Sequence, residues 1–100
     1  MESLEALVTW LRHKVVAEFV SQVWVFGSVL EVDRQPNDID IFVMYLDKHS
    51  KQIPDWRRNI QREFLEYSSL PLHMLALTHS ECVEVRAFLE SSLKGALRVR

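Results

Sequence analysis

Two short motifs hold most of the residues that could do chemistry. Gly27-Ser28 follows an apolar run, and Asp38-Ile39-Asp40 lies further along the chain. Side chains along a strand alternate between its faces, so Asp38 and Asp40 are expected to point to the same side. Two neighbouring carboxylates repel each other and are costly to bury unless a cation lies between them. Because carboxylate oxygens suit Mg²⁺ or Mn²⁺, the pair predicts a divalent-metal site.

The Gly27-Ser28 pair is typical of a turn that comes close to an anion. Glycine lets the backbone approach a ligand because it has no side chain. Ser28 offers a hydroxyl and a backbone N–H to phosphate oxygens, and a short helix after it would add further N–H groups. The pair therefore predicts a phosphate-binding turn. A lone Asp-x-Asp is common in loops, so the prediction depends on the two motifs together.

The elements that must position these motifs are predicted from hydrophobic periodicity and from turn and capping residues. The first half of the chain is predicted to form a helix from Ser3 to Val20, a strand from Val23 to Phe26, a turn or short helix from Ser28 to Val32, and a strand from Asp38 to Tyr45. The second half is predicted to form a polar loop from Lys48 to Ile53, a helix from Pro54 to Tyr67, and a strand from Leu70 to Leu77. A last helix starts at a Thr78–Glu81 capping box and is lined by Val85, Phe88, Leu89 and Leu93. This order predicts a single α/β (α+β) domain over residues 1–100, with a small mixed sheet of about three strands and helices packed on it.

Composition narrows the class of protein. The chain has 100 residues, of which 48% are hydrophobic and 26% charged, as in an ordinary soluble globular domain. A net charge of -2 argues against a dedicated nucleic-acid binder but does not exclude a nucleic-acid substrate. The single cysteine, Cys82, cannot form an intrachain disulfide. The single cysteine, the acidic N-terminus and the lack of a long apolar run together favour a cytoplasmic protein without a membrane segment.

The arrangement resembles the polymerase-beta-type nucleotidyltransferase superfamily, and most of all its minimal stand-alone members. The family signature is Gly-Ser, a spacer of about nine or ten residues, and Asp-x-Asp, and here residues 29–37 form the spacer. The resemblance covers nearly the full chain. It implies a nucleotidyltransferase fold in which Gly27 and Ser28 bind a nucleoside triphosphate, and Asp38 and Asp40 hold Mg²⁺ (or Mn²⁺). It also implies transfer of a nucleoside monophosphate to a hydroxyl acceptor.

Two features depart from the family pattern. The third predicted strand has no Asp or Glu, and the position expected for the family's third carboxylate holds His73. Imidazole can act as a base near neutral pH, but it is a poor ligand for Mg²⁺. His73 is therefore predicted as a base or a third ligand. Family members often carry Arg-Gly soon after Gly-Ser, whereas Arg34 is the nearby cation here, which leaves the phosphate contacts of this loop open.

Three hypotheses about function follow, each from a different class. The first is an active Mg²⁺-dependent nucleotidyltransferase with Asp38, Asp40 and His73 as its catalytic residues. The second is a degenerate domain that binds nucleotide and metal without efficient turnover. The third is a partner-binding protein, such as the antitoxin half of a two-protein module, which contacts a helical protein through apolar helix faces. A homodimer is also reasonable for so small a domain.

Overall fold

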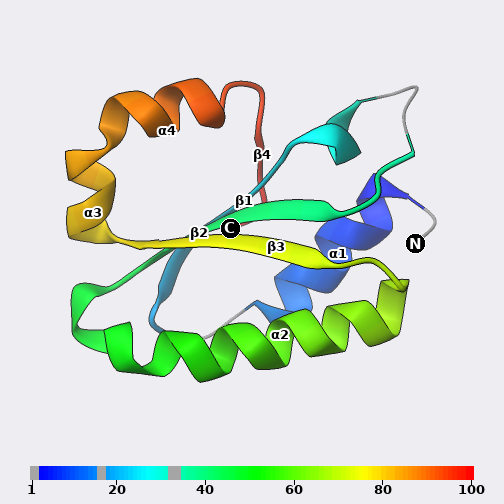
Figure 1. The fold of residues 1–100 in the computed structure, drawn as a ribbon, viewed down its shortest axis with the longest axis horizontal. Coiled ribbons are helices and arrows are strands. Elements are labelled where there is room, and N and C mark those ends of the chain that lie inside the picture. Colours follow the sequence, from blue (N-terminus) through cyan, green and yellow to red (C-terminus); the bar gives the residue numbers. More distant parts are fainter. Residues whose placement is uncertain (1–2, 16–17, 32–34) are drawn as a thin grey trace.

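The computed structural model of the chain describes residues 3–15, 18–31 and 35–100. Within them, four α-helices accompany a four-stranded mixed sheet of order β3-β2-β1-β4 (Figure 1). The strands are β1 (Val20–Phe26), β2 (Ile39–Tyr45), β3 (Leu72–Thr78) and β4 (Leu97–Arg98). β2 is antiparallel to β1 and parallel to β3, and β4 pairs antiparallel with β1. The predicted mixed α/β class is confirmed, with one strand more than expected.

One face of the sheet, here called the core face, is closed by two helices, α1 (Leu4–Lys14) and α2 (Ile53–Ser68) (Figure 1). Buried α1 and α2 residues join those of the strands in a single hydrophobic cluster. The strand residues of the core face are all exposed by 9% or less: Val23 and Val25 on β1, Ile39, Ile41 and Val43 on β2, and Leu72 and Met74 on β3. Their alternation along each strand is the pattern that the sequence predicted for β2.

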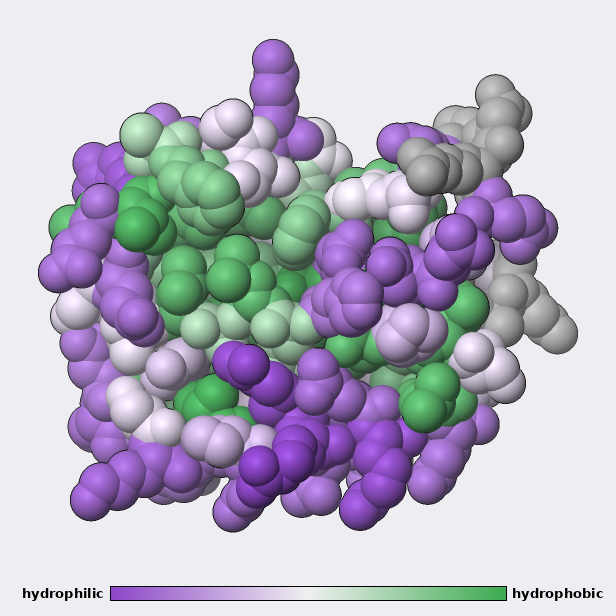
Figure 2. Space-filling view, in the orientation of Figure 1, coloured by the Kyte–Doolittle hydropathy of each residue, from purple (hydrophilic) through white to green (hydrophobic). Residues whose placement is uncertain are grey.

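The opposite face of the sheet, here called the second face, carries the alternate residues of the same strands. Register places them in rows across the sheet: Trp24, Phe42 and Leu75 in one row, and Phe26, Asp40 and His73 in the next. Phe42 is buried, whereas the other five are partly or fully exposed. Figure 2 shows hydrophobic surface between α4 and α2, with hydrophilic side chains beside it. The second face therefore combines an apolar area with a polar end.

The first helix is shorter than predicted. Ser3 caps α1 by accepting a hydrogen bond from the Ala6 amide, and α1 ends at Lys14, where Val15 leaves helical geometry (φ -96°, ψ 64°). Val20 begins β1 instead of ending the helix. A register shift between Val20 and Gln22 lets Val20 be buried along with the core-face valines, and that burial favours the strand over the helix. Val16 and Ala17, also within the predicted helix, lie outside the described residues.

The segment before α2 is also more regular than predicted. Residues 47–52 form 3₁₀ turns with a kink at His49 (φ -108°, ψ 17°), together η2 (Asp47–Gln52), where the sequence predicted a polar loop from Lys48 to Ile53. The Ser50 hydroxyl donates to the Asp47 carbonyl within this turn. α2 then begins at Ile53, which is only 3% exposed, and ends at Ser68, one residue beyond the predicted end.

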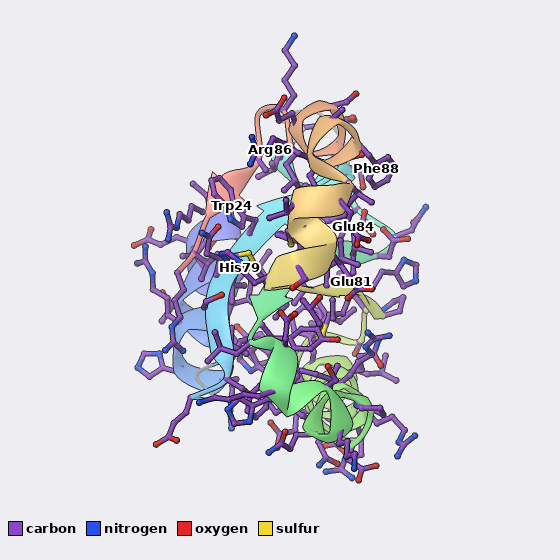
Figure 3. All side chains as sticks on the ribbon, turned by 90° about the vertical axis from the view of Figure 1, so that its left-hand side faces the viewer. Trp24, His79, Glu81, Glu84, Arg86 and Phe88 are labelled. Atoms are coloured by element: carbon purple, nitrogen blue, oxygen red, sulfur yellow. The ribbon has the colours of Figure 1, made fainter. Side chains whose placement is uncertain are left out.

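The last predicted helix is divided in two, α3 (His79–Glu84) and α4 (Arg86–Ser92). The predicted capping box is present, because the Glu81 amide donates to the Thr78 hydroxyl and the Thr78 amide to the Glu81 carboxylate. Val85 interrupts the helix (φ -111°, ψ 27°), so the residues of the predicted apolar face do not all lie on one continuous helix. Leu89 is therefore buried, whereas Phe88 is 59% exposed and lies on the side of α4 away from Trp24 (Figure 3).

β4 follows α4 and was not predicted. Gly95, at φ +80°, lets the chain turn back so that Leu97 and Arg98 pair with Val25 and Trp24 at the edge of β1. A two-residue strand has no periodic pattern of its own, so only its tertiary partner reveals it. Within the described residues, every helix is too short or too polar to cross a lipid bilayer.

Candidate metal centre

Asp38, Asp40 and His73 meet at the polar end of the second face because of the register between β2 and β3. Asp40 and His73 are paired residues of these parallel strands, and the Ile39 amide donates to the Pro71 carbonyl at the start of the pairing. Asp38 directly precedes β2, so the observed strand starts one residue later than the predicted one. The structure thus brings His73 beside the carboxylates, at the place expected for a third ligand.

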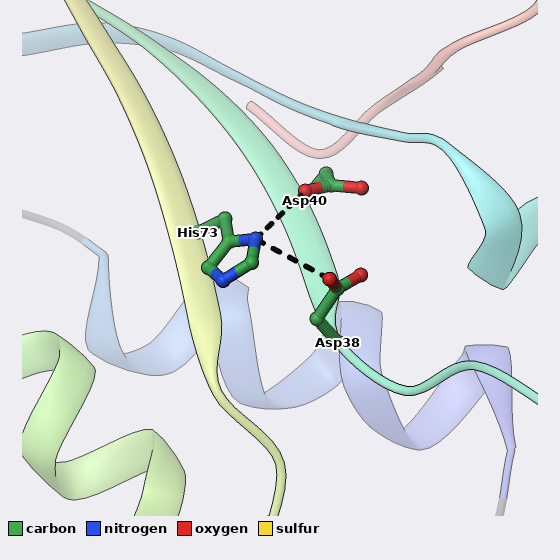
Figure 4. Close-up of side chains that lie close together, drawn as sticks. All are labelled: Asp38, Asp40 and His73. Atoms are coloured by element: carbon green, nitrogen blue, oxygen red, sulfur yellow. Dashed lines mark ion pairs between the residues drawn. The ribbon is translucent and has the colours of Figure 1, made fainter.

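The three side chains point at a shared space (Figure 4). His73 Nδ1 lies 3.4 Å from Asp38 Oδ2 and 3.5 Å from Asp40 Oδ1. One ligand atom from each residue lies within 4.8 Å of the other two. Among the described residues, these three form the cluster of His, Cys, Asp or Glu side chains whose atoms could hold a metal ion. We call it the Asp-Asp-His group.

The electrostatics of the group favour a cation. Burial, and secondarily the charge of Asp38, raises the pKa of Asp40 above its ordinary value, while His73 acts in the opposite direction. The Asp38 and Asp40 side chains are 34% and 27% exposed, so water screens their repulsion only in part. A positive charge placed among them would relieve both the repulsion and the cost of burial.

Gly27 lies against the same group. A Cβ built on it would be 2.5 Å from Asp40 Oδ2, so a side chain here would displace the carboxylate. Its backbone (φ 85°, ψ -158°) also occupies a region that is essentially restricted to glycine. Sequence reasoning assigned Gly27 to a ligand alone and missed this contact. The sequence did hold a signal for this contact, because Gly27 directly follows the strand that precedes the Asp-x-Asp strand in the chain.

Ser28 begins a short 3₁₀ helix, η1 (Ser28–Leu30), directly after Gly27. The Leu30 amide donates to the Gly27 carbonyl and the Glu31 amide to the Ser28 carbonyl, which fixes the turn. The predicted turn or short helix is therefore present, although Val32 lies outside the described residues. Arg34 also lies outside them. Gly27 thus lies beside Asp40, although residues 28–39 separate the two in the sequence.

The donor set fits a divalent cation. Two carboxylates and one imidazole supply hard oxygen ligands and one nitrogen ligand, a combination that metal sites in proteins use. The space that Gly27 leaves beside Asp40 Oδ2 keeps that carboxylate in the group. The pairing of β2 with β3 places Asp40 beside His73, and Asp38 directly precedes β2.

A separate groove lies away from this group. It has a volume of about 440 Å³ and is lined by α1 and α2 residues Trp10, Lys14, Glu63, Glu66 and Tyr67. Trp10 stacks on Tyr67 with ring centroids 5.6 Å apart, and Lys14 lies 3.9 Å from Glu63. The groove shares no residue with the Asp-Asp-His group, and it holds neither of the predicted motifs.

Comparisons with family models, with curated proteins and with solved structures give no match. The resemblance to nucleotidyltransferases therefore depends on the residues of the chain, and it stays a prediction.

Proposed function

We propose that this chain binds a nucleoside triphosphate together with a divalent cation and transfers a nucleoside monophosphate to a hydroxyl acceptor. The observation that carries the proposal is the contact between Gly27 and Asp40. A Cβ on Gly27 would meet Asp40 Oδ2 at 2.5 Å, so the predicted phosphate-binding turn borders the carboxylate pair, which supports a single site for both ligands. Neither motif alone would support this chemistry, whereas their juxtaposition supports triphosphate and metal binding together.

Each residue has a role in this proposal. A bound cation would neutralise the triphosphate and make its α-phosphorus more electrophilic. Asp38 and Asp40 hold that charge in place, and the turn at Gly27-Ser28 presents a hydroxyl and backbone to the phosphates. The acceptor oxygen forms a bond to the α-phosphorus while the bond to the bridging oxygen breaks and pyrophosphate leaves. His73 would take the acceptor's proton or complete the ligand set.

Titration calorimetry with ATP and excess Mg²⁺ or Mn²⁺ tests the binding part. We expect triphosphate binding that depends on the cation, and a loss of affinity of at least about tenfold in an Asp38→Asn, Asp40→Asn double variant. Asp47→Asn is the matched control, because Asp47 is an acidic residue outside the Asp-Asp-His group. Equal affinity in the double variant and the control would contradict the proposed site.

Turnover needs its own experiment. The protein is incubated with each of the four α-³²P-labelled nucleoside triphosphates, the cation, and protein, RNA or small-molecule acceptors. Transfer of label that the double variant lacks supports an active enzyme. Cation-dependent binding without transfer supports the degenerate domain.

A cytoplasmic location belongs to the same proposal and agrees with the free, half-buried Cys82.

Exposed apolar residues favour a partner-binding module as the second candidate function. Val83 and Phe88 on α3 and α4 are 56% and 59% exposed, and Val85 between them is 37% exposed. Exposed large apolar side chains on successive helices are a surface that a protein partner can cover. Sedimentation velocity of the wild type and of Phe88→Asp tests this for a second copy of the chain. A dimer that the variant loses supports it, and a monomer in both removes the homodimer.

A further inference from the structure

We propose that the Asp-Asp-His group is a transition-metal site in which His73 Nδ1 is a direct ligand, and that it discriminates against Mg²⁺ in favour of Mn²⁺, Co²⁺ or Zn²⁺. The inference rests on the proposed function and names the class of cation that the site takes. It assigns His73 as a ligand, where the sequence left it as a base or a ligand.

The distances within the group match shared coordination. Two donors that each lie about 2.1 Å from one cation are about 3.0 Å apart at a right angle and about 3.4 Å apart at a tetrahedral angle. His73 Nδ1 lies 3.4 Å from Asp38 Oδ2 and 3.5 Å from Asp40 Oδ1. The same ring nitrogen faces both carboxylates (Figure 4). The ligand atoms of Asp38 and Asp40 lie within 4.8 Å of each other, so a cation could take all three donors after small movements of the side chains.

The chemistry of the donors decides which cation is preferred. Mg²⁺ requires oxygen ligands in near-ideal octahedral geometry, whereas imidazole is a good ligand for zinc and its first-row neighbours. One nitrogen and two carboxylates neutralise a divalent charge without a third carboxylate. An imidazole as the third donor, in place of a carboxylate, thus shifts the selectivity of the group towards transition metals.

The exposure of the group leaves room for further ligands. The His73 side chain is 61% exposed, compared with 34% for Asp38 and 27% for Asp40. A cation held by these donors would keep coordination positions on the solvent side, as catalytic metal sites do. The Gly27-Ser28 turn borders this space on the Asp40 side, so a phosphate could occupy one of those positions.

The competing explanation is an internal ion pair. A protonated His73 would form the same contacts with Asp38 and Asp40 and would itself supply the positive charge. The two explanations differ in what they predict for added metal. An ion pair needs no metal and gives no ligand-field spectrum, whereas a metal site binds Co²⁺ through His73.

The test is a Co²⁺ titration of the full chain, followed by the visible ligand-field bands and by competition with Mg²⁺ and Mn²⁺. The variants are His73→Ala and His73→Asp, with His79→Ala as the control, because His79 is an exposed histidine outside the group. We expect Co²⁺ affinity to fall at least tenfold in His73→Ala and to be unchanged in His79→Ala. In His73→Asp, the ratio of Mn²⁺ to Mg²⁺ affinity should fall at least tenfold.

Circular dichroism of each variant confirms that the fold is kept. Co²⁺ affinity unaffected by His73→Ala, or a Mn²⁺-to-Mg²⁺ ratio unaffected by His73→Asp, overturns the inference. If triphosphate still binds with Mg²⁺ in that case, the proposed function survives alone. If no metal binds at millimolar concentration, whether triphosphate is present or not, the proposed function and this inference both fail. The ion pair is then the correct explanation.

Discussion

The two faces of the sheet differ although the same strands build them. On the core face, Ile39 and Ile41 are fully buried beneath α1 and α2. On the second face, Asp40 lies between them in sequence and remains partly exposed beside His73. Hydrophobic packing on one side thus holds the strands in register, and that register places the ligand atoms on the other side. So small a domain can thus position charged groups while leaving them partly exposed.

The largest expected effect comes from emptying the core face. Ile41→Ala should lower the free energy of unfolding by about 2–5 kcal/mol, because it removes buried methylene groups and leaves a cavity. Met44→Ala is the matched change on the second face of the same strand, where the side chain is only half-buried. Urea denaturation measures both. Equal losses would mean that the two faces contribute alike to stability.

Gly27→Ala should lower both stability and metal affinity, since it strains the backbone and displaces the Asp40 carboxylate. We expect a loss of about 1–3 kcal/mol from the unfavourable φ and ψ angles, together with weaker metal binding because the new Cβ collides with Asp40 Oδ2.

Gly95→Ala is the control for this substitution. Gly95 also has a positive φ of +80°, but a Cβ there meets nothing within 4 Å. It should lose stability and keep its metal affinity, as measured by urea denaturation and calorimetry. Equal metal affinities in the two variants would show that Gly27 matters only for the backbone.

Asp40→Asn should separate stability from binding. Burial and Asp38 raise the pKa of Asp40 in the folded protein, so the folded state binds this proton more tightly than the unfolded chain does. The stability from this group therefore falls as pH rises from the unfolded value near 3.8 through the folded pKa. With a chelator at neutral pH, the variant should melt at a higher temperature than the wild type, and excess metal should reverse the order. A lower melting temperature in chelator would mean that the pairing with His73 outweighs the repulsion.

The smallest expected effect lies outside the site, at Asp47. Its carboxylate accepts hydrogen bonds from the Ser80 hydroxyl and amide, and these bonds lower the pKa of Asp47. The group therefore stabilises the fold above the unfolded value of 3.8, and this contribution is lost as pH falls through the folded pKa. Asp47→Asn should make the melting temperature less sensitive to acid and leave metal affinity unchanged. An unaltered acid dependence would remove this role.

Local patterns were sufficient to predict most of the site. Alternation along the second predicted strand placed Asp38 and Asp40 on one side, and the resemblance to nucleotidyltransferases put His73 at the position of a third ligand. The features that were missed depend on tertiary contacts. Val20 enters β1 because the core buries it, β4 exists only through its pairing with Trp24 and Val25, and the approach of Gly27 to Asp40 requires the β1–β2 register.

The central claim is that a divalent cation binds to the Asp-Asp-His group on the second face. Amide NMR spectra with substoichiometric Mn²⁺ test it directly, because the paramagnetic ion broadens the signals of nearby residues. We expect selective broadening at residues 27–28, 38–40 and 72–74, with α1 on the core face unaffected. Broadening centred instead on Glu63 and Glu66 in the groove between α1 and α2, or no selective broadening, would contradict it.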